Sequence, residues 1–503
     1  MRRRPVRPGV GTRDGRDRTD TTTPGRSDGT DGRADGPFEP DRSLRLRSNG
    51  DFLRLWAGQT VSQLGTQITF LALPLVAIVA LGASAFEVGL LGALEWLPFL
   101  FFALPAGAWL DRLHRRPILI AADIGRALTL ASIPAAFALG RLELPQLYVV
   151  AFVNGSLTVF FDVGYQSYLP SLVERRQIAE ANGKLEMSYS GAQIAGPGLG
   201  GLLIGLLSAP VAILGDAISY LVSAAFLLRI RGPEQSRGPA AVEGAEAEGV
   251  RAVEGAVASG TATPERLGLR REIGEGLRFV VSHPYLRAIA ACTATLNLFG
   301  LIAMSIYLVF AVRELGLSPE LIGGIMALGN VGGLLGAAVA SKVGKRLGVG
   351  RTIVIAAAAG APTLLIVAVT PKEFPIPFLV AYGFLGGLGT LIYNVNQVSF
   401  RQSITPDRLL GRMNATIRFI VTGTVPIGMF IGGVLGSTIG LRPTIVVGAV
   451  GTMLAVVPLL LSPVRRLRSI DDDNSAVGLR KVGVDGLGGG VSRQEPEGRE
   501  AGS

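Results

Sequence analysis

The sequence is poor in the side chains from which most metal sites and catalytic centres are built. Cysteine occurs once, at Cys292, and histidine twice, at His114 and His283, in a chain of 503 residues. A single cysteine excludes a disulfide bond within the chain, and the two histidines show no zinc-binding spacing. No nucleophile–base arrangement is apparent, so the sequence does not predict an enzyme.

A phosphate-binding loop is also missing. No GxxxxGK[ST] segment occurs in the chain, so we expect neither ATP hydrolysis nor a bound cofactor, and a proton gradient or a partner would have to drive any transport. The run GPGLGG at 196–201 fits the pattern GxGxxG, but it lies within an apolar segment that no strand precedes. A dinucleotide site is therefore not predicted.

Charged residues are scarce, at 17% of the chain, whereas soluble globular proteins have about a quarter. The deficit is confined to long apolar blocks, and both ends of the chain are polar. The net charge is +10, but the arginines recur in short connectors rather than on one basic domain, so nucleic-acid binding is not expected. This pattern predicts a membrane protein in contact with lipid.

Twelve apolar segments are long enough to cross a bilayer as helices, which requires about 20 residues each. Six precede a polar stretch and six follow it, which predicts an all-α integral membrane protein with two pseudo-symmetric six-helix bundles. The segments are 52–81, 86–110, 117–139, 146–169, 179–207, 210–228, 285–312, 320–343, 351–370, 375–400, 409–439 and 443–461.

Basic residues concentrate in alternate connectors. The connectors after the second, fourth, sixth, eighth and tenth segments carry two or more each, whereas the others carry at most one. By the positive-inside rule, the basic connectors and both termini are cytoplasmic, in a multi-pass protein of the inner (plasma) membrane.

The polar segments complete the predicted domain organisation. We expect disordered cytoplasmic tails at 1–50 and 467–503, bundles at 51–231 and 285–466, and a cytoplasmic linker at 232–284. Within the linker, Leu269, Ile273, Leu277 and Val280 recur at helical spacing, which predicts an amphipathic helix over 265–283 on the membrane surface. This helix is either a tether or a regulatory element.

Two glycine-rich runs indicate an internal repeat. One constant spacing aligns Gly196, Gly200 and Gly201 with Gly428, Gly432 and Gly433, and FEVG at 86–89 similarly resembles ELIG at 320–323. The glycines, with Pro197, either allow close helix packing or form a kink that opens a cavity.

The connector after the second segment carries a second motif. In GAWLDRLHRR, the residues Gly107, Asp111, Arg112, Arg115 and Arg116 form the pattern G-x-x-x-D-R-x-x-R-R. Asp111 could cap the start of a neighbouring helix, while the arginines could anchor to lipid phosphates.

These motifs resemble those of the major facilitator superfamily, within it the enterobactin-exporter-like and macrolide-efflux-like branch. The connector motif is similar to the one between helices two and three of that family, with His114 where the family usually has glycine, and the run at 196–201 is similar to its antiporter motif. The resemblance covers about 52–464 and includes LWAGQ at 55–59, ADIGR at 122–126, FDVGYQS at 161–167, EGLR at 275–278 and DRLLGR at 407–412. It implies alternating access and proton-driven efflux. The fourth segment lacks the arginine of the best-known drug antiporters, so their proton route is not carried over.

Ionisable residues inside apolar segments are the candidates for proton coupling, because a charge in lipid is costly. Glu95, about 14 Å along its segment at 1.5 Å per residue, is the first candidate, and Asp162 is the second. Asp123 and Arg126 share a helix face and form either a structural pair or part of the coupling route. Asp216 is expected to be capped or to face water.

Polar side chains of the second bundle are candidates for lining a substrate cavity, with hydrogen bonding between helices as the alternative. They are Asn297, Asn330, Asn394, Gln397 and Arg418. Together these features predict a monomeric exporter of a small amphipathic compound, such as a drug, macrolide or siderophore, in exchange for protons. The alternatives are an importer of a nutrient and a membrane receptor or assembly protein that transports nothing.

Overall fold

The computed structural model describes residue 46 and residues 49–110, 113–231 and 269–467. The predicted tails lie almost entirely outside the described residues, as do most of the linker and the motif residues Asp111 and Arg112. The predicted disorder of the tails is therefore untested.

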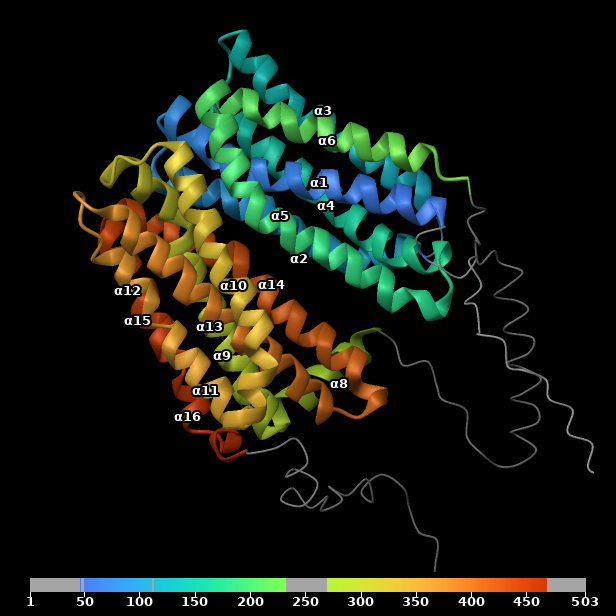
Figure 1. Ribbon diagram of the computed structural model, residues 1–503, viewed down its shortest axis with the longest axis vertical. Coiled ribbons are helices and arrows are strands. Elements are labelled where there is room, and N and C mark those ends of the chain that lie inside the picture. Colours follow the sequence, from blue (N-terminus) through green and yellow to red (C-terminus); the bar gives the residue numbers. More distant parts are fainter. Residues whose placement is uncertain (1–45, 47–48, 111–112, 232–268, 468–503) are drawn as a thin grey trace, which may run out of the picture. The chain divides into compact units, whose positions relative to one another are not determined.

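The twelve predicted membrane spans are confirmed within the described residues (Figure 1). The first half comprises α1 (Gly50–Leu75) continued by the π-helix η3 (Val76–Ala80), α2 (Ala85–Leu110), α3 (Arg115–Ala138), α4 (Leu144–Leu172), α5 (Ile178–Leu207) and α6 (Ala209–Leu228). The second half comprises α9 (Pro284–Val309) with the π-helix η5 (Phe310–Glu314), α10 (Pro319–Leu347), α11 (Val349–Gly360) with α12 (Thr363–Ala368), α13 (Pro375–Ser403), α14 (Asp407–Thr438), and α15 (Leu441–Leu454) with α16 (Val457–Leu460). The 3₁₀ turns η4 (Arg175–Gln177) and η6 (Pro463–Arg466) flank α5 and α16.

Several predicted segments stop short of a helix end, because hydropathy detects the part of a helix in lipid rather than its hydrogen-bonded length. Helix α10 shows this best, since it continues beyond 343 to Leu347 and has Lys345 and Arg346 in its last turn. Cations at that position are favoured by the partial negative charge of a helix C-terminus.

The two halves repeat the same packing scheme. In the first half α1 packs against α5 and α6, α2 against α4, and α3 against α4 and α6. In the second half α9 packs against α14 and α15, α10 against α13, α11 against α13, and α12 against α15. Each pair of the first half therefore has a counterpart in the second, and the internal repeat is confirmed. Figure 1 shows α1, α3 and α6 side by side in the first half.

The halves meet where the repeated glycines lie. Helix α5 packs on α10 and α14 packs on α2. A Cβ atom at Gly323 would lie 2.9 Å from the Cα of Gly201 and 2.3 Å from the carbonyl oxygen of Pro197. A Cβ atom at Gly89 would lie 2.6 Å from the Cα of Gly433. The two glycine pairs are thus the two copies of one backbone contact, and FEVG and ELIG supply equivalent partners in it.

The repeat extends to the helix ends near these contacts. The π-helices η3 and η5 end α1 and α9, and each is followed by a glycine with positive φ, Gly82 at +67° and Gly316 at +66°. Glycine adopts this conformation without steric cost, so each chain can turn directly into the next helix. Arg313 of η5 donates hydrogen bonds to the carbonyl oxygens of Gly82 (2.9 Å) and Ala83 (2.6 Å), which ties the two turns together.

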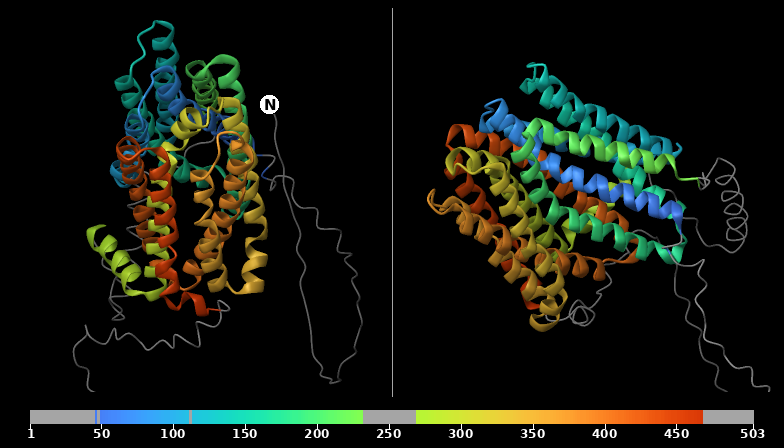
Figure 2. Two further views of the ribbon diagram at one scale, coloured as in Figure 1. Left: turned by 90° about the vertical axis from the view of Figure 1, so that its left-hand side faces the viewer. Right: turned by 45° about the horizontal axis from the view of Figure 1, so that its top comes forward.

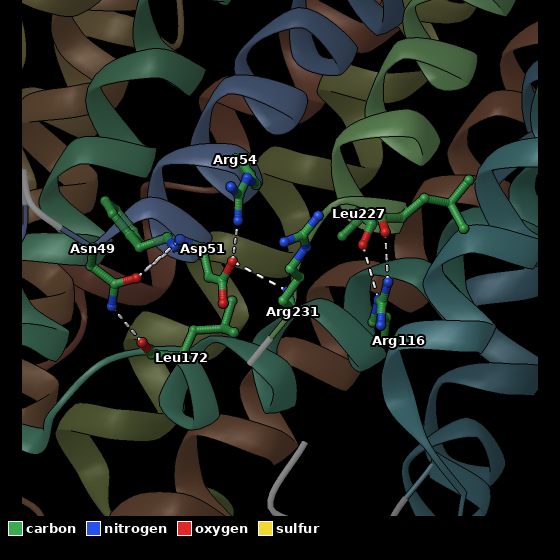
Figure 3. Close-up of polar contacts among 9 residues, drawn as sticks. Asn49, Asp51, Arg54, Arg116, Leu172, Leu227 and Arg231 are labelled. Atoms are coloured by element: carbon green, nitrogen blue, oxygen red, sulfur yellow. Dashed lines mark hydrogen bonds and ion pairs between the residues drawn. The ribbon is translucent and has the colours of Figure 1, made fainter. Parts of the chain in front are cut away.

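We call the end with the connectors α2–α3, α4–α5, α10–α11 and α13–α14 the basic end, and the other the opposite end. At the basic end of the first half, Asn49 caps α1 and joins it to α4 (Figure 3). Its Oδ1 accepts hydrogen bonds from the amides of Asp51 (3.1 Å) and Phe52 (3.0 Å), and its Nδ2 donates to the carbonyl oxygen of Leu172 (2.7 Å). The contacts between halves described above lie towards the opposite end.

The linker helix α8 (Leu269–Ser282) lies where the sequence predicts an amphipathic helix, and it also contacts the second half. It packs on α14 (Figure 2), with Val280 buried against Met413 and Ile417, and Glu275 forms an ion pair with Arg412. Leu277, predicted to lie on the same apolar face as Val280, is 46% exposed. The helix is therefore held by protein contacts on one side, which its hydrophobic periodicity alone did not reveal.

The glycine contact between halves predicts a selective loss of stability. Replacing Gly323 with alanine should cost about 1–3 kcal/mol, because the new methyl group overlaps the backbone of α5. Alanine at Gly324, where a Cβ meets no atom within 4 Å, should be neutral or stabilising by up to about 1 kcal/mol, since alanine favours helix. Thermal unfolding of both variants in detergent tests this, and equal stabilities would contradict the contact.

Candidate functional site

An ion pair lies buried inside the first half. Asp123 and Arg126, on successive turns of α3, are 0% and 3% exposed and bind each other directly. The guanidinium of Arg126 lies between two aromatic rings, 4.2 Å from the centroid of Phe161 on α4 and 4.1 Å from that of Tyr220 on α6. Such stacking adds electrostatic attraction to the ion pair. The predicted pairing is confirmed, and it joins three helices.

A second carboxylate, Asp216 of α6, is completely buried nearby. It accepts hydrogen bonds from the hydroxyl groups of Thr69 on α1 (2.5 Å) and Ser219 (3.0 Å). Gly65 makes this possible, because a Cβ there would lie 2.4 Å from Asp216 Oδ1 and would push α1 away. Of the two alternatives predicted for Asp216, capping by polar groups is confirmed and exposure to water is not. The position of Asp216 along the segment could not decide between them, because it does not indicate the direction of a side chain.

The two leading candidates for proton coupling are more accessible than these groups. Glu95 of α2 and Asp162 of α4 are both partly exposed. Asp162 lies within electrostatic reach of Arg126 of the first half and of Arg418 of the second. Arg418 itself is exposed on α14. Asp162 and Arg418 are therefore a carboxyl group and a cation, one from each half. Their electrostatic attraction depends on the distance between the halves.

The backbone next to Glu95 is tightly packed. A Cβ at Gly155 of α4 would lie 2.2 Å from the carbonyl oxygen of Glu95, so this glycine allows α4 to contact α2 directly. The backbone of Glu95 is therefore held in place by α4, whereas the residue as a whole remains partly exposed.

A cavity of about 450 Å³ lies among α9, α10, α11, α12, α13 and α15 of the second half. Its described walls contain no Asp, Glu, Lys or Arg. The polar groups on them are asparagine, threonine and tyrosine, including Tyr307 and Tyr382, whose ring centroids are 6.2 Å apart. A largely apolar cavity with a few neutral hydrogen-bonding groups is typical of a site for a small amphipathic molecule.

Three of the predicted cavity residues lie on these walls, namely Asn297, Asn330 and Asn394. Asn330 also donates a hydrogen bond to the carbonyl oxygen of Gln193 on α5, 2.5 Å away in the first half. Gln397 and Arg418 are not among the lining residues. Gln397 is buried and accepts a hydrogen bond from Arg401 (3.3 Å), so its role is to join turns of α13.

The glycines of the α5 motif serve two neighbours. A Cβ at Gly196 would lie 2.3 Å from the Cβ of Gln67 on α1, and one at Gly200 would lie 3.3 Å from the Cα of Ile68. Gly201 faces α10 of the other half instead. The packing interpretation of the motif is therefore supported, both within the first half and between the halves. Pro197 lies inside one continuous helix.

The described residues of the connector motif play different parts. Arg116 caps the end of α6, with Nε donating to the carbonyl oxygen of Leu227 (2.9 Å) and Nη2 to that of Leu228 (2.8 Å) (Figure 3). Arg115 begins α3. A Cβ at Gly107 would meet no atom within 4 Å, so close packing does not require glycine there. Arg116 thus stabilises a helix end rather than only contacting lipid.

Sequence reasoning missed several residues of these sites. Tyr220 and Thr69 gave no signal, because single hydroxyl-bearing residues are common in membrane helices. The tyrosines of the cavity were missed for the same reason. The GxxxT spacing of Gly65 and Thr69 could have shown that one face of α1 allows a close polar approach.

Twelve membrane-spanning helices in two matching halves, with a neutral cavity and buried ion groups, define a membrane transport protein. The sequence matches the Major Facilitator Superfamily over residues 55–371 and 289–481. These matches span most of the chain, which therefore belongs to this superfamily of transporters and is not an enzyme.

Curated relatives match over nearly their whole length. The chain is 28% identical to the multidrug efflux pump Tap of Mycolicibacterium fortuitum, over 81% of this chain and 94% of that protein. It is 23% identical to the macrolide efflux protein A of Streptococcus pyogenes, over 84% of this chain and 97% of that protein. Among solved structures, a bacterial homologue of the iron transporter ferroportin in an inward-facing state superposes with a TM-score of 0.62 at 16% identity, over 82% of this chain and 98% of that chain. This last likeness shows a shared fold.

The buried ion pair predicts a non-additive effect on stability. Replacing Arg126 with methionine should destabilise the protein by about 3–5 kcal/mol, because Asp123 is left buried without its counter-ion. The double variant Asp123→Leu, Arg126→Met should recover most of this loss, since apolar side chains of similar size need no counter-ion. Unfolding of both variants in detergent measures the difference, and a double variant no more stable than Arg126→Met alone would contradict this account.

Proposed function

We propose that this protein exports a small amphipathic compound from the cytoplasm by alternating access, in exchange for protons. The observation that carries the proposal is the match to relatives named as multidrug and macrolide efflux pumps, along more than four fifths of this chain. The neutral, largely apolar cavity supports it, because such walls suit an amphipathic molecule better than a charged nutrient.

In this proposal the basic end faces the cytoplasm. The arginines and lysines that gather there support this orientation through the positive-inside rule. The contacts at the opposite end, formed by the two glycine pairs and by Arg313, then close the outer side of the membrane. A state closed on the outside is the state in which an exporter collects its substrate.

In this proposal the two halves have different roles, substrate binding in the second half and proton binding in the first. The second half supplies the neutral cavity for the substrate. The first half supplies the intramembrane carboxyl groups, of which Glu95 is the first candidate for carrying the proton and Asp162 the second. Arg418 supports the candidacy of Asp162, since protonation would cancel the attraction between that carboxylate and the opposite half.

Transport in inverted membrane vesicles tests direction and coupling. We expect vesicles with an acid lumen to accumulate at least one member of a radiolabelled panel of amphipathic antibiotics that includes a macrolide, and a protonophore to abolish the accumulation. The acid lumen corresponds to the outside of the cell, so protons leave the lumen as the compound enters. Accumulation only in right-side-out vesicles would indicate an importer, and no flux of any compound would favour a receptor or assembly protein.

The same vesicles identify the proton carrier. Replacing the carrier with its amide, as Glu95→Gln or Asp162→Asn, should preserve flux down a substrate gradient and remove the acceleration by acid. If both variants still respond fully to the acid lumen, neither residue is the carrier.

Filling the cavity should weaken substrate binding without unfolding the protein. Gly300 of α9 lines the cavity, and a Cβ there meets no atom within 4 Å. We expect Gly300→Phe to lower affinity for the transported compound by about tenfold or more, which corresponds to at least about 1.4 kcal/mol. Gly324→Phe is the matched control, because Gly324 has equal room but does not line the cavity. Equal affinities of the two variants would place the substrate elsewhere.

A further inference from the structure

We propose that Asp216 is a proton-binding site of this transporter and that it carries a proton in the conformation described here. Asp216 differs from both leading candidates for proton coupling, Glu95 and Asp162. The first half would therefore hold a further proton-binding site. The proposal extends the proton exchange proposed above, but protonation of Asp216 can be observed in the absence of transport.

The charges buried around Asp216 do not balance if every carboxyl group is ionised. Asp123, Arg126 and Asp216 are 0%, 3% and 0% exposed, which places two acids and one base in the same protein interior. Arg126 binds Asp123 directly. An unpaired charge in a region of low dielectric constant is much costlier than a neutral acid. Asp216 is therefore the carboxyl group that takes up a proton.

The other ionisable groups that act on Asp216 do not remove this imbalance. Glu95 of α2 adds a further acid, and Tyr220 of α6 is neutral when protonated. Helix α1 contributes hydroxyl groups instead, since Thr69 binds Asp216 and Thr66 binds the hydroxyl of Tyr220 at 3.1 Å. Arg126 is thus the nearby cation among the described residues, and Asp123 already engages it.

A proton fits this site better than a metal cation. Calcium and magnesium ions need about six or more oxygen ligands. The hydrogen-bond partners of the Asp216 carboxyl oxygens among the described residues are the hydroxyls of Thr69 and Ser219. Gly65 brings the backbone of α1 against the carboxyl group, so little room remains beside it. A carboxylic acid bound to two hydroxyl groups fills the same space without further ligands.

The site is linked mechanically to the contact between the halves. Thr66 and Thr69 flank Gln67 and Ile68, the residues of α1 against which Gly196 and Gly200 of α5 pack. The next face of α5 carries Gly201, which contacts α10 of the other half. Separation of α5 from α10 would therefore move α1 relative to α6 and weaken the hydrogen bond from Thr69. Loss of this bond and entry of water would release the proton when the opposite end opens.

Infrared spectroscopy of the purified full-length protein in lipid, at neutral pH and without substrate or gradient, tests the proposal. The wild type should show a carbonyl stretch of a protonated carboxylic acid that is lost in Asp216→Asn. Asp123→Asn should also lose it, because Arg126 is then available to balance an ionised Asp216. Glu174→Gln, which changes an exposed acid, should keep the band.

Persistence of the band in Asp216→Asn would overturn the proposal, and so would its persistence in Asp123→Asn. A band that disappears on adding sodium would also overturn it, since sodium would then be the bound cation. Unfolding of a variant is recognised from the amide bands of the same spectrum, and in that case Thr69→Val, which removes one hydroxyl, should shift the acid band in frequency. Vesicles that show no proton-driven transport while the band behaves as expected would refute the proposed exchange but not the protonation of Asp216.

Discussion

The hydrocarbon core of a bilayer offers no water to a polar group, and this constraint governs the whole molecule. It requires that backbone groups bond within helices, which explains why the spans are helical. It also requires that charges face protein. Asp123, Arg126 and Asp216 obey it completely, enclosed by aromatic rings and hydroxyl groups. The same constraint makes the protonation state of a buried acid depend on its neighbours, so the conformation of the protein can control proton binding.

Glycine is the second requirement, because lipid provides no hydrophobic driving force between helices and close packing must replace it. The repeated contacts Gly201–Gly323 and Gly89–Gly433 place backbones against each other between the halves. Within each half, the glycines that precede these in the same helix allow close packing. Gly196 and Gly200 bring α5 onto α1, and Gly428 and Gly432 bring α14 onto α9. Helix α5 in the first half and α14 in the second therefore each have two glycine faces. One face packs on the helix's own bundle, and the other packs on the opposite bundle. In the alternating access proposed above, a single helix of each half would transmit movement in both directions.

The sequence predicted those features that local patterns determine. Length and hydropathy located the spans, and the glycine spacing predicted the repeat, because each is a property of one segment. The ion pair of Asp123 and Arg126 followed from helical geometry in the same way. The cavity could not be predicted, because it depends on how six helical segments fail to fill the space between them. Asn297, Asn330 and Asn394 border that space whereas Gln397 does not, although all four carry the same kind of amide side chain. The sequence could not decide whether Asp216 is capped or faces water, because the glycine that lets α1 approach it lies about 150 residues away in the chain.

The neutral cavity of the second half and the buried Asp216 of the first half differ in chemistry, but contacts through α5 connect them. Asn330 belongs to the wall of the neutral cavity and also donates to Gln193 on α5. Helix α5 in turn supports α1, whose Thr69 binds the buried Asp216. A compound that draws Asn330 into its own hydrogen bonds would weaken the link to α5, and protonation of Asp216 would change the hold of α6 on α1. Both events act on the same helix at the contact between halves. In the exchange proposed above, substrate and proton would therefore influence each other without meeting, which is the physical requirement for coupling between two separate sites.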